Sequence, residues 1–257
     1  MSSGIQGTNP VYVKGEKKTF DNPAADNGPW STTDDFALKQ PLWCAPGDCY
    51  SYGTSNPHLA SIVLRRLTGM EMEDYMRLRL TGPLGFGTWG YAMYRPKLKS
   101  GIDSNGRMLH TPGGGSNAVR STDVLRFAYL LLKEGKWGDM QIVPADFVRL
   151  CGRSVSYNPH FTHSFNFNVN DDGHIAGVPR DAFWKGGSGG YSIYVVPSMD
   201  MVIYKMGGTE GQYDPALTHL PVLYKYDGSR DNWKPGDPKV IGDSTAKTLQ
   251  MVIAAVQ

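Results

Sequence analysis

The feature of this 257-residue sequence that most constrains its fold is a change in the spacing of apolar residues near residue 160. Before that point, several segments repeat apolar residues every three or four positions, which is the spacing of helices that bury one face. After it, short runs rich in β-branched and aromatic residues are separated by Gly, Pro and Asp, a pattern typical of strands. Helices followed by strands indicate an α+β fold.

Helices are expected at about 32–39, 56–68, 72–80, 121–134 and 144–151. Ser31 or Thr32 can cap the first. In the second, Pro57 suits the first turn and Gly69 suits the end. The apolar face of this second helix should consist of Leu59, Ile62, Val63 and Leu67.

Strands are expected at 165–169, 191–196 and 201–206, and the last two should form an antiparallel hairpin through the turn 197–200. A helix over 243–256 closes the chain and should bury Leu249, Val252, Ile253 and Val256. We therefore expect residues 1–157 to form a mostly helical and loop region, and residues 158–257 to form antiparallel strands with a C-terminal helix. The long Gly- and Pro-rich segment 207–237 suggests a site wall or an interface.

Composition excludes several classes of partner. The net charge of +2 and the 19% of charged residues leave no basic stripe, so we expect no nucleic acid partner. The longest apolar runs are far shorter than the roughly 20 residues of a membrane span. The pair His160 and His163 has no carboxylate near it in sequence, so we expect no metal there. We also expect no other cofactor.

The three cysteines are too few for a disulfide framework. Cys44 and Cys49 flank a four-residue turn and could close a small loop in an oxidising compartment. The simpler interpretation is that they are two reduced thiols, while Cys151 lies in the core.

Tyr52 lies just before the helix over 56–68. A phenol can act as a base near neutral pH only if a nearby cation lowers its pKa. An ordinary tyrosine, with a pKa of ~10, is ionised to about one part in a thousand at pH 7. A unit positive charge at ~4 Å in an effective dielectric of ~20 contributes about 4 kcal/mol, which is enough to lower that pKa by about three units. Lys185, which precedes Gly186 and Gly187 at the start of a strand, is the candidate cation.

These motifs occur in a distinctive order along the chain. A Ser-Gly pair at 3–4 precedes the tyrosine turn and helix at 45–69, a Pro-Leu-Gly segment at 83–85, and a Gly-Gly segment and helix at 111–137. A Lys-Gly-Gly strand and the strand pair after it follow at 184–208. In this order they resemble the serine β-lactamase and penicillin-binding-protein superfamily. The similarity is to its class C-like branch, which also contains esterases and 6-aminohexanoate-dimer hydrolases.

The resemblance implies a β-lactamase/transpeptidase-like fold, an antiparallel sheet flanked by helices with a mostly helical region beside it. It implies a serine acyl hydrolase that cleaves a small-molecule ester or amide through an acyl-enzyme. By that resemblance Tyr52 moves the nucleophile's proton, Lys185 favours the ionised phenol, and the backbone N–H of Ser188 binds the oxyanion. Substrate-binding positions are Thr54, Gly187 and Gly189, although a register that uses 188–190 as the Lys-x-Gly equivalent stays open.

The sequence departs from the family pattern at the nucleophile, which in the family lies in a Ser-x-x-Lys well before the Ser-Gly pair. The one such string here, Ser244 to Lys247, opens the last helix and is expected to act as its cap. We therefore expect a fragment without the N-terminal part of the fold, inactive alone, or a chain that covers the gap with a partner or second copy. The alternative function is a non-catalytic ligand-binding or interaction module of the same fold.

Overall fold

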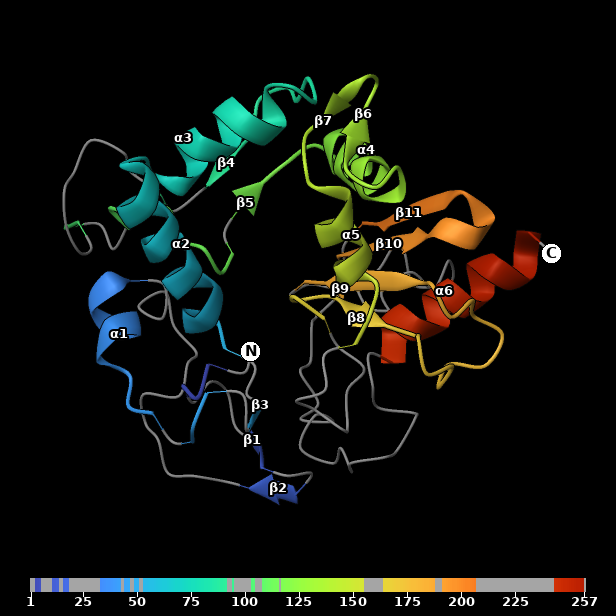
Figure 1. Cartoon of the computed structure of the whole chain (residues 1–257), viewed down its shortest axis with the longest axis horizontal. Helices are drawn as coiled ribbons and strands as arrows, with labels where there is room; N and C mark the ends of the chain where they lie inside the picture. Colours follow the sequence, from blue (N-terminus) through green and yellow to red (C-terminus); the bar gives the residue numbers. More distant parts are fainter. Residues whose placement is uncertain are drawn as a thin grey trace, which may run out of the picture. The chain divides into compact units, whose positions relative to one another are not determined.

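In the computed structural model, the described residues are 3–5, 11–13, 16–18, 33–42, 44–46, 49–50, 53–91, 94, 103–104, 108–115, 117–154, 164–187, 191–206 and 243–256. The chain divides into two compact units (Figure 1). Unit 1 is Met1–Asp123 with Ser156–Pro159, and unit 2 is Val124–Val155 with His160–Gln257. The domain boundary expected at residue 157 stays a prediction, and the compact units differ from it in grouping residues 124–155 with the sheet.

The described residues of unit 1 form three helices and several two- and three-residue strands. Its helices are α1 (Asp34–Lys39), α2 (Ser55–Thr68) and α3 (Met72–Met76), the last continuing into a π-helical turn, Arg77–Thr81. Strands β1 (Val11–Val13), β2 (Glu16–Lys18) and β3 (Cys49–Tyr50) form one antiparallel sheet in the order β2-β1-β3, and β4 (Gly90–Tyr91) pairs with β5 (Asn117–Ala118).

The ends of α1 and α2 follow from local chemistry. The hydroxyl of Thr33 accepts a hydrogen bond from the Phe36 N–H at 3.3 Å, so Thr33 caps α1 and the expected cap at Ser31 or Thr32 is wrong. Gly69 ends α2 as expected, with φ of 69° and its N–H donated to the Arg65 carbonyl at 2.9 Å. This left-handed conformation favours glycine at a helix end.

The face that α2 buries differs from the expected apolar one. The buried residues of this helix are Ser55, His58, Ser61 and Ile62, whereas Val63 is 56% and Leu67 is 81% exposed. Of the four predicted face residues, only Ile62 is buried. The prediction was wrong because the polar residues on the other face satisfy one another, as described below.

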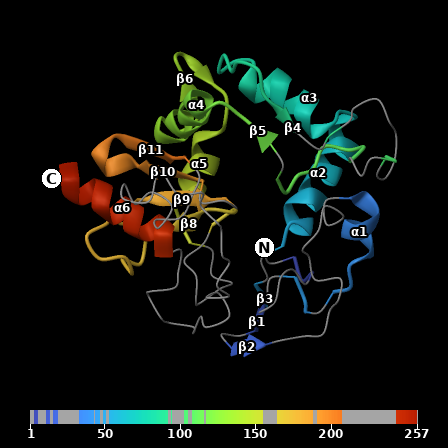
Figure 2. The ribbon, with the colours of Figure 1, turned by 180° about the vertical axis from the view of Figure 1, so that it is seen from behind.

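Unit 2 is a three-layer arrangement around a four-stranded antiparallel sheet in the order β11-β10-β9-β8 (Figures 1 and 2). Its strands are β8 (Asn168–Val169), β9 (Phe183–Gly186), β10 (Ser192–Val196) and β11 (Met201–Lys205). Its helices are α4 (Ser121–Leu132), which begins in unit 1, α5 (Ala145–Cys151) and α6 (Asp243–Val256), with a small hairpin of β6 (Lys136–Trp137) and β7 (Met140–Gln141) between α4 and α5.

The two faces of the sheet have separate cores because successive side chains of a strand point to opposite faces. On one face, α6 packs through Leu249 and Ile253 against a cluster that includes Trp184, Tyr194 and Val196. On the other, α4 and α5 supply Ala128, Leu131, Val148 and Cys151, which pack with Val169, Phe183 and Val195. The expected β10–β11 hairpin is confirmed, with a 3₁₀ turn at Pro197–Met199.

The buried face of α6 and the state of the cysteines differ in part from what the sequence predicts. Val256 is 59% exposed, so the expected buried face of α6 holds only in part. Cys44 is disulfide-bonded, so the interpretation of this residue as a reduced thiol is wrong, whereas Cys151 is a free and buried thiol as expected. Burial raises the pKa of the Cys151 thiol to about 11, which suits a packing role.

Within the described ranges, no helix has the length and apolarity of a membrane span. In the same residues, no group of three or more His, Cys, Asp or Glu side chains could hold a metal ion. The pair His160 and His163 lies outside them.

Candidate functional site

The predicted site residues are only partly covered by the structure. Tyr52, Ser188 and Gly189 lie outside the described residues, as does the alternative register 188–190. Thr54, Lys185 and Gly187 are described, with Thr54 in unit 1 and the other two in unit 2. The convergence of Tyr52 with Lys185 therefore stays a prediction.

Lys185 is the third residue of β9, so it does not open a strand as expected. It is half-buried and stands opposite Ile193 of β10. Alternation along β9 puts Lys185 on the same face of the sheet as Phe183, the face on which α4 and α5 pack. A lysine with an apolar stem against this layer can hold its ammonium group at the strand end.

Gly187 follows β9 and is exposed. Its N–H donates to the Tyr191 carbonyl at 2.7 Å, which closes the β9–β10 connection. A Cβ added at Gly187 would come no closer than 3.7 Å to any atom that the structure describes, which is ordinary contact. Packing within the described residues thus does not require glycine here, and the open position is compatible with a ligand lying against the strand end.

Gly113 and Gly114, in contrast, are required by packing against the first turn of α2. A Cβ at Gly113 would lie 2.2 Å from the Pro57 carbonyl oxygen, and one at Gly114 would lie 2.6 Å from the Thr54 carbonyl oxygen. Both obstacles are backbone atoms, which cannot rotate away. The two glycines therefore let one segment of backbone sit directly on the turn that follows Tyr52.

Gly113→Ala should lower the free energy of unfolding by about 1–3 kcal/mol, because the new methyl group overlaps backbone and forces the two segments apart. Gly187→Ala is the matched control, since its Cβ has room and its backbone needs no left-handed conformation. In urea unfolding followed by circular dichroism, the free energy of unfolding of this control should equal that of the wild type or exceed it by up to about 1 kcal/mol. Equal stability of the two variants would contradict the close packing at Gly113.

A polar network that the sequence did not reveal lies on the buried side of α2. His58 is fully buried, and its Nε2 is 3.0 Å from Oδ1 of Asp34 on α1. Arg65, two turns further along α2, donates to Oδ2 of the same carboxylate. Glu71 lies just before α3. Its Oε1 is 2.7 Å from Nδ1 of His110, and its Oε2 accepts a hydrogen bond from the Thr111 N–H at 3.1 Å.

This network ties four segments of unit 1 together: α1, α2, the start of α3 and residues 110–113. Arg65 lies between its two acidic groups, with 3.8 Å from its Nη1 to Oε1 of Glu71. Because opposite charges and hydrogen bonds satisfy the buried groups, the polar face of α2 is stable inside the unit. One sequence signal could have indicated this face: Ser55, His58 and Ser61 recur at the three-residue spacing of a helix face.

The contacts of Asp34 with His58 and Arg65 lower the pKa of its carboxyl group. Burial by itself raises the pKa of the carboxyl group, but hydrogen bonds from His58 and Arg65 and the positive charge of Arg65 lower it to about 2. The folded value lies below the ordinary 3.8. The resulting stabilisation is therefore fully present above about pH 4 and is lost as pH falls toward 2.

Asp34→Asn should accordingly be least stable relative to the wild type above pH 5, and this difference should shrink by about 2 kcal/mol between pH 5 and pH 2. Urea unfolding at several pH values measures it. The control is Asp35→Asn, the neighbouring carboxylate, which is 85% exposed and should shift stability by under about 0.5 kcal/mol. A stability difference between the wild type and Asp34→Asn that stays constant down to pH 2 would refute the ionised, paired state of Asp34.

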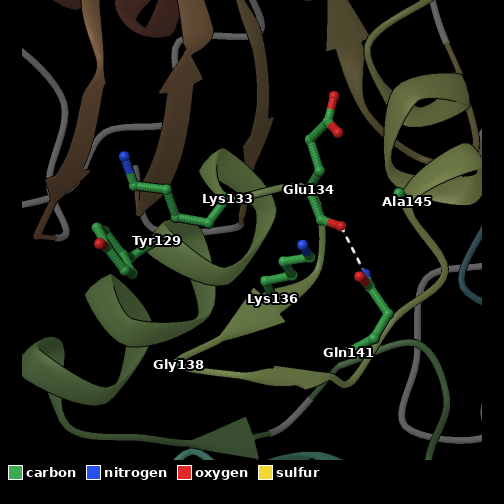
Figure 3. A pocket seen from close by; sticks show the side chains of 7 residues that line it. All are labelled: Tyr129, Lys133, Glu134, Lys136, Gly138, Gln141 and Ala145. Atoms are coloured by element: carbon green, nitrogen blue, oxygen red, sulfur yellow. Dashed lines mark hydrogen bonds between the residues drawn. The ribbon is translucent and has the colours of Figure 1, made fainter.

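A pocket of about 480 Å³ lies in unit 2, between the end of α4, the β6–β7 hairpin and the start of α5 (Figure 3). Its lining is Tyr129, Lys133, Glu134, Lys136, Gly138, Gln141 and Ala145. Two of its polar side chains have local partners: Lys133 pairs with Asp200 at 2.6 Å, and the Gln141 amide donates to the Glu134 carbonyl at 2.8 Å. None of the predicted site residues that the structure describes lines it, so it is not the candidate active site.

Comparison with known proteins defines the class of this fold. A putative 6-aminohexanoate-dimer hydrolase from Bacillus anthracis aligns with 96% of the chain at a TM-score of 0.60 and 16% identity. EstCE1, a hydrolase with promiscuous acyltransferase activity, aligns with 67% of the chain at a TM-score of 0.52 and 18% identity. A penicillin-binding-protein homologue from Caulobacter crescentus aligns with 72% of the chain at a TM-score of 0.51 and 16% identity. The alignments span 58%, 56% and 61% of those three chains, respectively. Among curated proteins, none matches.

The fold is thus the β-lactamase/transpeptidase-like α+β fold, as expected from the sequence. The sequence model of the Beta-lactamase family matches residues 10–219, which is most of the chain. The chain belongs to the Beta-lactamase family, within the superfamily of serine β-lactamases and penicillin-binding proteins.

Proposed function

We propose that this protein is a serine acyl hydrolase that cleaves a small-molecule ester or amide through an acyl-enzyme. The observation that carries the proposal is the single family match over residues 10–219, which includes both the Tyr52 turn and the Lys185 strand. The structure of β9 is compatible with it, because Lys185 stands at the strand end beside the open position of Gly187. Proteins of the same fold include EstCE1, a hydrolase, and the putative 6-aminohexanoate-dimer hydrolase from Bacillus anthracis.

In this proposal each residue has one role. Tyr52 takes the proton of a serine nucleophile and returns it to the leaving group, which is general acid–base catalysis. Lys185 favours the ionised phenol, and the Ser188 N–H binds the oxyanion of the tetrahedral intermediate. Thr54, Gly187 and Gly189 border the bound acyl group. The nucleophile itself is not assigned to a residue of this sequence.

The test uses the protein expressed from its own gene, including whatever that gene encodes before Met1. Incubation with p-nitrophenyl butyrate should release p-nitrophenol continuously, and intact-mass spectra taken during turnover should show the mass gain of one butyryl group. Peptide mapping of the acylated protein should place that group on a serine. Saturable binding of the ester without an adduct or turnover would instead favour the alternative, a non-catalytic ligand-binding module.

Gly187→Ala sharpens this test, because it fits the described structure without close contact. If substrate lies against the strand end, the methyl group should lower kcat/KM by at least about tenfold while the unfolding midpoint stays at or above that of the wild type. Unchanged kcat/KM would remove Gly187 from the substrate site. An unchanged unfolding midpoint would show that the variant folds as the wild type does, and the loss of kcat/KM would then report contact with substrate.

A further inference from the structure

His58 makes hydrogen bonds of opposite direction at its two ring nitrogens. Nδ1 accepts the backbone N–H of Gly113 at 3.2 Å, and Nε2 lies 3.0 Å from Oδ1 of Asp34. The Gly113 amide can only donate, and the Asp34 carboxylate, with its lowered pKa, accepts. These two partners require a neutral ring that carries its proton on Nε2.

The Gly113 contact joins the ring to the backbone packing described above. Gly113 rests on the Pro57 carbonyl and Gly114 on Thr54, so the glycine segment covers residues 54–58 of the chain. His58 is the fourth residue of α2, and its ring holds the same segment by a hydrogen bond to the Gly113 N–H. The imidazole and the two glycines thus form one clamp on the first turn of α2.

This clamp acts on the backbone that follows the proposed base directly. Thr54, which Gly114 contacts, is two residues after Tyr52 in the sequence. Asp34 and Ser61 hold the ring in turn. The Ser61 hydroxyl donates to the His58 carbonyl at 2.7 Å and lies 3.4 Å from Nδ1. A fixed ring therefore sets where the helix entrance lies relative to residues 113–114.

We propose that His58 is a positioning residue: its Nε2-protonated ring clamps the Gly113–Gly114 segment onto the first turn of α2 and so fixes the backbone that carries Tyr52. The part of this proposal that concerns Tyr52 rests on the proposed function. The clamp itself depends only on the contacts of unit 1. A histidine that merely filled space in the core would not need an acceptor at one specific ring nitrogen.

Two substitutions separate the two ring nitrogens. The side-chain amide of Asn reaches about as far as Nδ1, so His58→Asn keeps an acceptor for the Gly113 N–H. The amide of Gln reaches about as far as Nε2, so His58→Gln keeps a donor for Asp34 and leaves the Gly113 N–H without its acceptor. Hydrogen exchange of the Gly113 amide, followed by NMR, should be about tenfold faster in the Gln variant than in the wild type and nearly unchanged in the Asn variant.

Ester hydrolysis provides the second measurement. Misplacing the backbone before α2 should affect the chemical step more than binding, so His58→Gln should lower kcat by about tenfold or more with little change in KM. His58→Asn should retain most of kcat. If exchange at Gly113 rises in the Gln variant while kcat stays at the wild-type value, the positioning role is overturned.

The ring of the wild-type protein gives a test that does not depend on whether the variants fold. The ¹⁵N shifts of the two His58 ring nitrogens should identify Nδ1 as unprotonated and Nε2 as protonated near neutral pH. The opposite tautomer would overturn the clamp, and so would equal exchange of the Gly113 amide in all three proteins. If the wild type hydrolyses no ester, the proposed function fails on that result, while the tautomer and the exchange pattern still decide the clamp.

Discussion

Replacing Tyr52 by phenylalanine should slow ester hydrolysis by about 10²- to 10⁴-fold, the usual contribution of a positioned general acid–base group. The substitution removes one oxygen atom and keeps the ring, so the unfolding midpoint should change little. The measurement is kcat/KM for p-nitrophenyl butyrate, taken with the protein as its gene encodes it. A loss in kcat as large as that in kcat/KM would place the effect in the transition state.

Tyr50→Phe is the matched control for this prediction, since the sequence places a second tyrosine two residues earlier, in β3. That variant should keep the wild-type rate within about threefold. If Tyr50→Phe abolishes hydrolysis and Tyr52→Phe does not, the assignment of Tyr52 as the base is wrong.

Truncating Leu249 to alanine should destabilise unit 2 by about 2–5 kcal/mol. Leu249 is fully buried and belongs to the cluster through which α6 packs on the sheet, with Trp184 and Tyr194 among its members. Removing it leaves a cavity that the sheet cannot fill by moving, because its strands are held by their ladder of hydrogen bonds. Urea unfolding should show this loss as a lower midpoint of the transition in which unit 2 unfolds.

The same helix supplies the control for that prediction. Met251 is 62% exposed, two residues further along α6. Met251→Ala should change stability by under about 0.5 kcal/mol. Comparable losses in the two variants would mean that α6 does not pack on the sheet through the Leu249 face.

The β10–β11 hairpin and the C-terminal helix could be predicted closely from the sequence. In contrast, β9 was not among the strands expected from the pattern of apolar residues, and β8 covers only Asn168–Val169 of the strand expected at 165–169. The β10–β11 hairpin and the bounds of α6 follow from local signals, namely the alternation of apolar residues and a turn containing Pro197 and Asp200. Local signals are enough there because the paired strands are neighbours in sequence. The β-lactamase-like fold could be predicted as well, from the order of motifs.

The buried side of α2 could not be predicted in the same way. Counting apolar residues favoured the face with Val63 and Leu67, but the structure buries His58 and Ser61. Apolar periodicity carries no information about polar residues whose partners are distant in sequence, and Asp34 is 24 residues from His58. The two glycine segments posed a related problem. Only three-dimensional contacts distinguish Gly113, which packing requires, from Gly187, which packing leaves open.

The central claim is that Tyr52 and Lys185 act as one proton-transfer unit, and a double-mutant cycle tests it most directly. The rates to compare are kcat/KM for p-nitrophenyl butyrate in the wild type, Tyr52→Phe, Lys185→Ala and the double variant. If the lysine acts through the phenol, the double variant should be no slower than the slower single variant, within about threefold. If the two losses multiply instead, the side chains act independently, and the shared relay is contradicted.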